Sequence, residues 1–560
     1  MNIGIDFGST YTVVSLYNQN NKQVYAYNLG EGADASIPSV LTKRNGKYRF
    51  GAAARNQSGQ KGTRVFKGFK MLLSSGNEEE WEKRGFTEED NPESVSSRFL
   101  ESILEKVLSD HGEEQIEHLF IGVPEIWQQG INTIDGRTRI RNICRSFPFV
   151  KEAQVVSEPA AASAYFAYHD SLENGEGFSG RILLIDYGGG TLDITLTKVD
   201  STLDADGNPD MEIRIEAETG AGENKDGAIG QAGIAYMEAV AEEAIIAAGK
   251  AEGIEIDRES LYKNARFYQA VNQFESSLLT QTEEVEEVFA SCMDEDDLDD
   301  LWGEFTSFSF LFENEEITRN LDVDITYSLM LRVYNRVIRD VLHEEIEKIC
   351  SYMKAQGIDY KSPSTKDLKI VLVGGFGNFY LVHQQVDEEF GFSAYADNRS
   401  QGTRLTRADR EHAISYGTVL LANQVMRIRH TAPYSIGAAA KLNGKDAPIY
   451  AFRHRQDIKF RNVYYASDKN GDPYVYLIRD FSHIFVDWGS GRPKRYALRK
   501  EFAEKIREAM SEIGSSEDIG PDMVVIGFSL DQSEVLSMHF QKYDLFGGKP
   551  VGRAASIELT

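Results

Sequence analysis

Two short segments of the sequence carry the same set of chemically useful residues. Residues 5–10 read Ile-Asp-Phe-Gly-Ser-Thr, and residues 185–191 read Ile-Asp-Tyr-Gly-Gly-Gly-Thr. In each segment an apolar stretch ends in an aspartate, an aromatic residue, small residues and a threonine. Glycines let the backbone turn and bring its N–H groups close to a ligand, and clustered N–H groups form a nest for an anion. The repeat therefore predicts two phosphate-binding hairpins.

The aspartate beside each predicted nest suggests a metal ion. Asp6 and Asp186 could hold Mg²⁺ through water, because this ion keeps several of its water ligands in proteins. A single Asp-x-Gly turn is more often an ordinary hairpin. Two copies in one chain, each between β-rich stretches, favour a phosphate site, with two similar lobes that clamp one nucleotide from opposite sides.

A third glycine element has the sequence Val-Gly-Gly-Phe-Gly-Asn at residues 373–378. It follows a predicted strand and opens a predicted helix, a context that suits close approach of the backbone to a nucleotide sugar or phosphate. Such turns are common, so the element is weak evidence by itself. The chain has no GxxxxGK[ST] motif and no GxGxxG after a strand, which argues against a P-loop enzyme and a dinucleotide-binding fold.

The segments around these motifs predict an α/β protein. Apolar residues near a 3.6-residue period predict helices over residues 95–108, 232–253, 327–357 and 411–425, and Pro159 is placed to open another helix. Beyond about Met426 the pattern changes to strand alternation with turn residues, and residues 501–514 are the exception that looks helical. We therefore place a domain boundary between Met426 and Pro433.

Length and composition limit the classes of function. The 560 residues suggest several domains, and 41% apolar with 26% charged residues is typical of a globular protein. A net charge of −28 disfavours nucleic acid and membranes as partners, and the acidic run at residues 293–300 is interpreted as a solvated surface. The N-terminus does not resemble a signal peptide and no long apolar run occurs, so we expect a cytoplasmic protein. Cys144, Cys292 and Cys350 lie far apart and are interpreted as reduced thiols.

Taken in order, several segments resemble the motifs of the actin-like ATPase superfamily and, within it, the heat-shock protein 70 family. The resemblance covers about residues 2–425. IGIDFGSTYT and LLIDYGGGTLDITL resemble the two phosphate motifs, FGAAARNQ the segment with the catalytic basic residue, and VVSEPAAASAY the family's motif of a strand followed by Asn-Glu-Pro-Thr-Ala-Ala-Ala-Ala-Tyr. IVLVGGFGNF resembles the adenosine motif, and HAISYGTVLLANQV the helix that closes the ATPase domain.

This resemblance implies a two-lobed, actin-like (ribonuclease H-like) α/β ATPase domain over residues 1–425. Lobe I would span about residues 1–175 and lobe II about 176–425. Residues 426–433 would be a linker, and residues 434–560 a small β-rich, β-sandwich-like domain that binds substrate without a helical lid.

The resemblance also implies a set of site residues. Asp6 and Asp186 would hold the water shell of Mg²⁺, Glu158 and Asp193 would orient the attacking water, and Arg55 falls where the family has its phosphate-contacting lysine. The nucleotide would be bound by Gly8, Ser9, Thr10, Tyr11, Gly188, Gly189, Gly190, Thr191, Gly230, Gly374, Gly375, Gly377 and Asn378.

Some positions depart from the family. A glycine pair of the family corresponds to Gly230-Gln231, the lysine–arginine pair that stacks on adenine falls in residues 272–279, where neither occurs, and Asn378 replaces an arginine. The phosphate end therefore matches better than the base end. The linker sequence QVMRIRHTAPY is basic where the family has a hydrophobic acidic one.

The expected function is that of an ATP-dependent chaperone. ATP, with Mg²⁺, would be hydrolysed to ADP in the cleft, and hydrolysis would be coupled to binding of an unfolded client polypeptide, with co-chaperones as further partners. Three alternatives stay open: a nucleotide-gated binding module with little hydrolysis, a small-molecule kinase, and an actin-like filament protein.

Overall fold

The computed structural model describes most of the chain, and it divides the chain into two compact units. Unit 1 comprises Met1–Trp127 and Arg139–Ile428, and unit 2 comprises Gln128–Thr138 and Arg429–Thr560. The described residues are 1–29, 35–74, 78–124, 127, 136–174, 177–203, 209–221, 232–262, 264–280, 307–313, 317–361, 367–391, 407–428, 432–442, 445–460, 462–477, 483–489, 491–497, 504, 523–531, 533–544 and 547–559.

The first sheet of unit 1 is built on the N-terminal hairpin. Its strands lie in the order β3 (Gln23–Ala26), β2 (Tyr11–Asn18), β1 (Asn2–Phe7), β8 (Ile116–Val123) and β9 (Val150–Ser157), with β4 (Ile37–Pro38) also paired to β2. The pair β1–β2 is antiparallel, whereas β8 and β9 add in parallel. Alternate residues of β1, namely Ile3, Ile5 and Phe7, are fully buried, as the period of a strand requires.

The second sheet of unit 1 repeats this arrangement. Its strands lie in the order β15 (Leu368–Val373), β10 (Gly180–Tyr187), β11 (Leu192–Leu203), β12 (Pro209–Ala221) and β16 (Arg427–Ile428). An antiparallel run of three consecutive strands is again extended by a parallel strand beside the first of them. The apolar sequence of β10 is explained by burial on both faces, because Leu183 and Ile185 face one core and Ile182 and Leu184 another.

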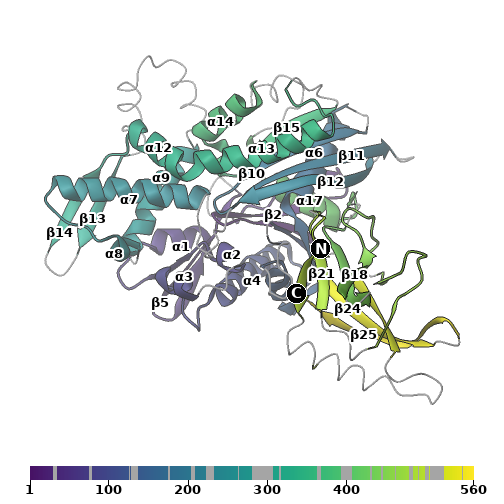
Figure 1. Cartoon of the computed structure of the whole chain (residues 1–560). Coiled ribbons are helices and arrows are strands. Elements are labelled where there is room, and N and C mark those ends of the chain that lie inside the picture. The colour runs from purple at the N-terminus through teal and green to yellow at the C-terminus, as the bar shows by residue number, and fades with distance from the viewer. Residues whose placement is uncertain are drawn as a thin grey trace. The chain divides into compact units, whose positions relative to one another are not determined.

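Two helices connect the sheets (Figure 1). Helix α6 (Glu158–Asn174) packs on β10, β11 and β12, helix α17 (Ala413–Ala422) packs on β1, β2 and β8, and the two helices pack on each other. Glycines allow this close approach: a Cβ at Gly4 would overlap the backbone of Val419, and one at Gly417 would overlap the backbone of Ala161. The crossing helices therefore fix how the two sheets lie relative to each other.

The opposite faces of the two sheets carry the larger cores. On the first sheet, α4 (Pro92–His111) and α5 (Gly136–Ser146) contribute to one core. On the second sheet, a core is shared by α7 (Gly233–Ala251), α9 (Ala265–Thr280), α12 (Tyr327–Tyr334), α13 (Asp340–Ala355), α14 (Tyr380–Phe390) and the hairpin β13 (Phe308–Glu313) and β14 (Thr318–Val323). Figure 1 shows α7, α9, β13 and β14 side by side. The helices expected from periodicity are thus present, with the stretch at 327–357 interrupted by a π-helical segment, Asn335–Arg339.

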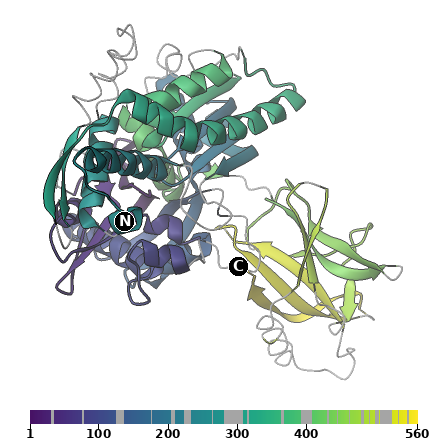
Figure 2. The same cartoon turned by 60° about the vertical axis from the view of Figure 1, so that its left-hand side comes forward.

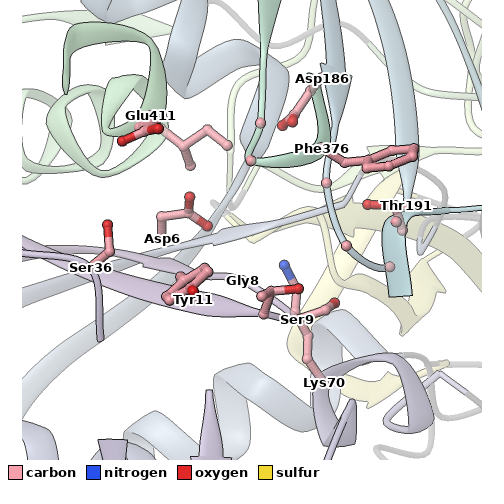
Figure 3. Close-up of a pocket in the computed structure, with 18 of the residues that line it drawn as sticks. Asp6, Gly8, Ser9, Tyr11, Ser36, Lys70, Asp186, Thr191, Phe376 and Glu411 are labelled. Carbon is pink, nitrogen blue, oxygen red and sulfur yellow. The ribbon is translucent and has the colours of Figure 1, made fainter. Parts of the chain in front are cut away.

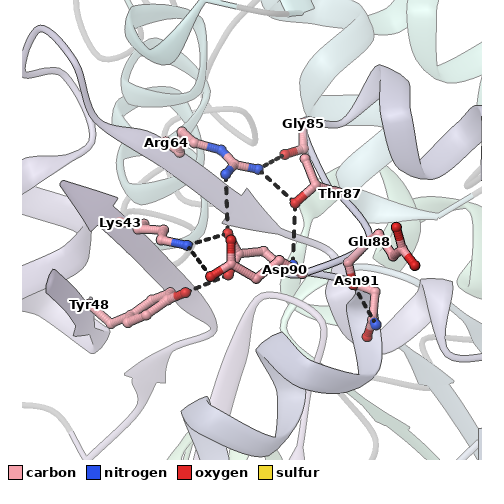
Figure 4. Close-up of polar contacts among 9 residues, drawn as sticks. Lys43, Tyr48, Arg64, Gly85, Thr87, Glu88, Asp90 and Asn91 are labelled. Atoms are coloured by element: carbon pink, nitrogen blue, oxygen red, sulfur yellow. Dashed lines mark hydrogen bonds and ion pairs between the residues drawn. The ribbon is translucent and has the colours of Figure 1, made fainter. Parts of the chain in front are cut away.

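A buried carboxylate connects a small sheet to the segment before α4. The strands of this sheet are β5 (Val40–Arg44), β6 (Lys47–Phe50) and β7 (Arg64–Lys67). Asp90 accepts hydrogen bonds from Lys43 Nζ at 2.8 Å, Arg64 at 3.1 Å and Tyr48 Oη at 2.5 Å (Figure 4). The Asp90 side chain is completely buried, so these donors replace the water that it loses.

Unit 2 is formed by two antiparallel sheets around one core. One sheet has the order β18 (Lys445–Phe452), β17 (Ser435–Leu442), β21 (His483–Asp487) and β22 (Lys494–Ala497). The other has the order β19 (Tyr464–Tyr465), β23 (Met523–Leu530), β24 (Leu536–Asp544) and β25 (Lys549–Glu558), with β20 (Val475–Leu477) on β23. Side chains of both sheets share a core, and Figure 2 shows the sheets as green and yellow layers.

The chain is a mixed α/β protein, as the sequence predicts. In the described ranges, no helix has the length and apolar character needed to span a membrane. Several sequence expectations fall outside those ranges, namely Gly230, Cys292, the acidic run at residues 293–300, and all but Glu504 of the predicted helix at residues 501–514.

Candidate functional site: a carboxylate-lined cavity between two hairpin tips

The tips of the two repeated hairpins meet in unit 1. In the second tip, the Gly188 N–H donates to Thr191 O at 2.9 Å and closes the turn between β10 and β11. A Cβ at Gly189 would overlap Thr10 Oγ1, and one at Gly190 would overlap Ser9 Oγ. Only glycine therefore allows the second tip to lie against the first.

A cavity of about 140 Å³ lies at this meeting point (Figure 3). The hairpin tips supply much of its wall. The rest comes from Ser36, α2 (Phe69–Leu72), α6, α7, α9, the turn after β15, the end of α16 (Arg407–Glu411) and the start of α17. The lining residues are Asp6, Gly8, Ser9, Thr10, Tyr11, Val13, Ser36, Lys70, Glu158, Asp186, Gly188, Gly189, Gly190, Thr191, Gly233, Met237, Glu275, Gly374, Gly375, Phe376, Glu411 and Ile414.

Asp6 and Asp186 end equivalent strands and both reach this cavity (Figure 3). Burial raises the pKa of Asp6 to about 7, with a contribution from the negative charge of Glu158 and an opposing one from Lys70. Burial also raises the pKa of Asp186, and Glu158, Asp193 and Asp6 add to that shift. Each carboxylate is thus held where its charge is unfavourable unless a proton or a cation neutralises it.

This donor set fits a hydrated divalent ion. Two carboxylates supply hard oxygen ligands, which Mg²⁺ prefers, and this ion usually takes only one or two of them together with water. In the part of the chain that the structure describes, no group of three or more His, Cys, Asp or Glu side chains is placed to hold a metal. Asp6 and Asp186 therefore suit an ion that keeps most of its water shell.

A buried lysine supplies positive charge to the cavity. Lys70, on α2, donates to Glu158 Oε1 at 2.6 Å, and the two side chains are only 4% and 5% exposed. Burial alone would lower the pKa of Lys70, but the negative charges of Glu158, Asp6 and Asp186 raise it above its usual value. Lys70 is thus held protonated among the three carboxylates.

Glu158 is fixed at the start of α6, where a carboxylate is favoured by the helix dipole. It reaches the cavity, whereas Asp193 does not line it. Asp193 lies on β11 directly opposite Asp186 in the strand pair and is almost completely buried. The two acids that were predicted to orient water therefore occupy different positions. Glu158 is at the wall of the cavity, and Asp193 is the cross-strand neighbour of Asp186, outside the lining.

Comparison with known proteins finds similarity to the same family that the sequence motifs resemble. No protein-family model matches the chain. It is similar to a protein named chaperone protein DnaK from Halobacterium salinarum (22% identity over 194 residues, 35% of this chain and 28% of the relative) and to one of the same name from Mycoplasmopsis agalactiae (25% over 197 residues, 35% and 30%). It is also similar to heat shock cognate 70 kDa protein 3 of Dictyostelium discoideum (23% over 223 residues, 35% and 34%).

The chain is thus similar to heat-shock 70 and DnaK proteins over part of its length. The similarity is limited, since each of these matches covers about a third of the chain and about a third of the relative. This similarity supports the family resemblance of the sequence motifs. Activity, cofactor and partners are treated below as proposals.

Arg55, like Asp193, was carried over from the heat-shock 70 motifs but does not line the cavity. Arg55 lies on α1 (Gly51–Gln57) and donates instead to the Tyr11 hydroxyl at 3.1 Å. The cation in the described lining is Lys70, which none of the sequence motifs indicates. The available signal was its position in the otherwise apolar run Val65-Phe66-Lys-Gly-Phe-Lys-Met-Leu-Leu, where a charged side chain needs a buried partner.

The third glycine element contributes less of the wall than the heat-shock 70 resemblance implies. Gly374 and Gly375 line the cavity, but Gly377 does not. The side chain of Asn378 and the whole of Gly230 lie outside the described residues. Phe376, between the glycines, lines the cavity and packs on Tyr187 with ring centroids 5.1 Å apart, so an aromatic ring was a further element missed from sequence.

The described lining is strongly acidic. It carries five carboxylates, those of Asp6, Glu158, Asp186, Glu275 and Glu411, and one lysine. Glu275 and Glu411 were not predicted, because they come from α9 and α16 (Arg407–Glu411), far from any glycine motif. A phosphate ligand can enter such a cavity only together with cations or protons that offset the negative charge.

Proposed function

We propose that this chain is a magnesium-dependent ATPase of the heat-shock 70 type, with an actin-like two-lobed domain over about residues 1–425. The supporting observation is the meeting of two equivalent hairpin tips at a cavity that also contains Asp6, Asp186 and Lys70. The repeated strand order of the two sheets and the pair of crossing helices support the two-lobed fold. Residues 426–433 would be the linker, and residues 434–560 a β-rich substrate-binding domain.

In this proposal, the phosphates of the nucleotide are held by the backbone N–H groups of the two tips. Ser9, Thr10 and Thr191 add hydroxyl donors from opposite sides of the cavity. Mg²⁺ would supply positive charge to the phosphate oxygens, and Asp6 and Asp186 would hold it through water. Such positioning of charge carries most of the catalysis in phosphoryl transfer.

Glu158 and Lys70 form the second part of the proposed site. Glu158 would orient a water molecule or accept its proton, and Lys70, 2.6 Å from that carboxylate, would stabilise negative charge on the transferred phosphoryl group. Asp193 would act behind Asp186 as a positioning residue. We assign the role first expected of Arg55 to Lys70, because only Lys70 lines the cavity.

Coupling to a client polypeptide is the chaperone part of the proposal. Helix α17 supplies Ile414 to the cavity wall, and a short segment then leads to β16, which pairs in parallel with β12 at the edge of the second sheet. Ligand-dependent closure of the two lobes would change the environment of this segment. If closure alters client affinity, a client must alter nucleotide affinity to the same extent.

The full chain with Mg²⁺-ATP tests this function. We expect hydrolysis of ATP to ADP without any added acceptor, which a small-molecule kinase would not show, and loss of that turnover in Asp186→Asn with an unchanged circular dichroism spectrum. Binding of a reduced, unfolded protein should differ between ATP and ADP.

Near-normal turnover in Asp186→Asn would refute the metal assignment. Binding of ATP without hydrolysis would favour the nucleotide-gated module, and ATP-dependent sedimentation the filament.

A further inference from the structure

Glu275 differs from the carboxylates at the centre of the cavity. Glu158 is paired with Lys70, and Asp6 and Asp186 are suited to a metal. Glu275 reaches the same cavity from α9, and 7% of its surface is exposed. It is therefore a buried acid that the proposed reaction does not use.

The surroundings of Glu275 include two cations from the first half of unit 1. One turn earlier on α9, Asn272 accepts a hydrogen bond from the buried Lys67 Nζ at 2.5 Å. Burial raises the pKa of Glu275, while the charges of Lys67 and Arg55 and the nearby Thr10 side chain, which lines the same cavity, oppose the shift. Glu238 of α7 adds a further negative charge nearby and is itself paired with Arg84 at 3.4 Å.

These contacts have two consequences for an anionic ligand. Thr10 belongs to the first hairpin tip, so a phosphate chain held by that tip would lie close to the Glu275 carboxylate, and like charges repel strongly where water is scarce. Glu275 also neutralises part of the positive charge of Arg55 and Lys67, which would otherwise attract the same phosphates. Both effects act in one direction, against binding.

We propose that Glu275 sets the affinity of the cavity for polyphosphate ligands and keeps it low, so that the ligand is released quickly. This inference rests on the proposed function, since it concerns the same site. Release of product is then promoted by the cavity wall itself.

A test compares the full-length wild type with Glu275→Gln, which keeps the shape of the side chain and removes its charge. Titration calorimetry with Mg²⁺-ADP and with Mg²⁺-tripolyphosphate at pH 8 should give a Kd about 10-fold lower for the variant with both probes. The dissociation rate of a fluorescent ADP should fall by a similar factor. Tripolyphosphate has no sugar or base, so it isolates the effect on phosphate.

Glu345→Gln is the matched control. Glu345 is buried to a similar degree on α13, is paired with Lys348 Nζ at 2.6 Å and does not line the cavity, so its loss should leave the Kd within twofold. Glu275→Ala should strengthen binding as Glu275→Gln does, which guards against an effect specific to the amide. The ratio of the wild-type Kd to the Glu275→Gln Kd, both measured at the same pH, should approach one as the pH falls, because protonation also removes the charge of Glu275.

An unchanged or higher Kd in both Glu275 variants would overturn the inference. Weaker binding of Mg²⁺-ADP with unchanged binding of tripolyphosphate would identify Glu275 as an acceptor for sugar hydroxyls, which also contradicts it. If wild type and variants bind neither probe, the proposed function fails and this inference fails with it. Binding by the wild type without a gain in the variants refutes the inference alone.

Discussion

The ammonium of Lys70 lies 2.6 Å from the carboxylate of Glu158, and both groups are almost completely removed from solvent. The two residues lie far apart in the sequence. Lys70 comes from α2, the short helix after β7, and Glu158 from the first turn of α6. Their pairing fixes a positive and a negative charge at the cavity wall. It also makes each charge dependent on the other for its stability in the interior.

Lys70→Met should therefore damage both catalysis and stability. We expect turnover to fall about 100-fold or more, since a charge that stabilises the transition state is removed. The free energy of unfolding should fall by about 3–5 kcal/mol, because Glu158 is left buried without its partner. The double variant Lys70→Met with Glu158→Gln should recover much of the stability and none of the activity. Recovery of turnover in the double variant would contradict the assignment.

The pH dependence of magnesium binding should follow the raised pKa of Asp6. The pKa of this carboxyl lies at about 7, so a proton occupies it at pH 6 and must leave before a metal can bind. Affinity for Mg²⁺ should therefore rise between pH 6 and pH 8, with protons released on binding. Calorimetry in buffers of different ionisation enthalpy measures that release. In Asp6→Asn the rise should be absent or much smaller.

The same raised pKa predicts how stability changes with pH in the absence of metal. The folded state binds the proton of Asp6 more tightly than the unfolded chain does, because the ordinary pKa of an aspartate carboxyl is 3.8. This stabilisation is full below about pH 4 and is lost as the pH rises towards 7. Added Mg²⁺ should offset the loss, so the melting temperature should gain more from Mg²⁺ at pH 8 than at pH 5. A gain independent of pH would contradict the assignment.

Adjacent glycines at the third glycine element offer a matched pair. Gly374 has φ of +84°, and a Cβ there would overlap Asp186 Oδ1 and Tyr187 O. Gly374→Ala should therefore lower the free energy of unfolding by about 2 kcal/mol or more and displace the Asp186 carboxylate. A Cβ at Gly375 would meet nothing within 4 Å, so Gly375→Ala should leave the melting temperature of the ligand-free chain nearly unchanged. Equal effects would show that local crowding is not the cause.

The Asp90 cluster predicts an acid-sensitive part of the fold. Burial alone would raise the pKa of Asp90, but hydrogen bonds from Lys43 and Tyr48 and the charge of Arg64 lower it below its usual value. Its stabilisation is therefore present above about pH 4 and is lost as the pH falls through the lowered pKa.

Asp90→Asn should lower the free energy of unfolding by about 3 kcal/mol at pH 7, because Lys43 and Arg64 lose a buried partner. At pH 2 the difference from the wild type should be much smaller. Glu117→Gln is the control, since its pair with Lys151 at 2.5 Å is half exposed and should be worth less than about 1 kcal/mol. A large loss in the control, or none in Asp90→Asn, would contradict this interpretation.

The elements with local patterns could be predicted from sequence, and the residues placed by tertiary packing could not. The two hairpins were predictable because strand, aspartate, glycines and threonine follow one another closely along the chain, and each turn forms locally. Lys70 and Glu275 reach the same cavity only because α2 and α9 fold back over it. No spacing in the sequence expresses that approach.

Arg55 shows what a sequence motif leaves open. It lies in a segment that resembles a catalytic motif, yet its guanidinium is used by the Tyr11 hydroxyl at 3.1 Å. A motif resemblance shows which segment a residue belongs to. The orientation of the helix in the fold determines which of its side chains line a cavity.

The repeated sheets of unit 1, each contributing one hairpin tip and one crossing helix, have a mechanical consequence. In the proposed two-lobed architecture, a ligand between the two halves would be sensed as a rotation of one half against the other, with little rearrangement inside either. Small angular changes at the seam become large displacements at the outer edges. Probes of occupancy, such as distance labels, are therefore best attached at those edges, far from the chemistry.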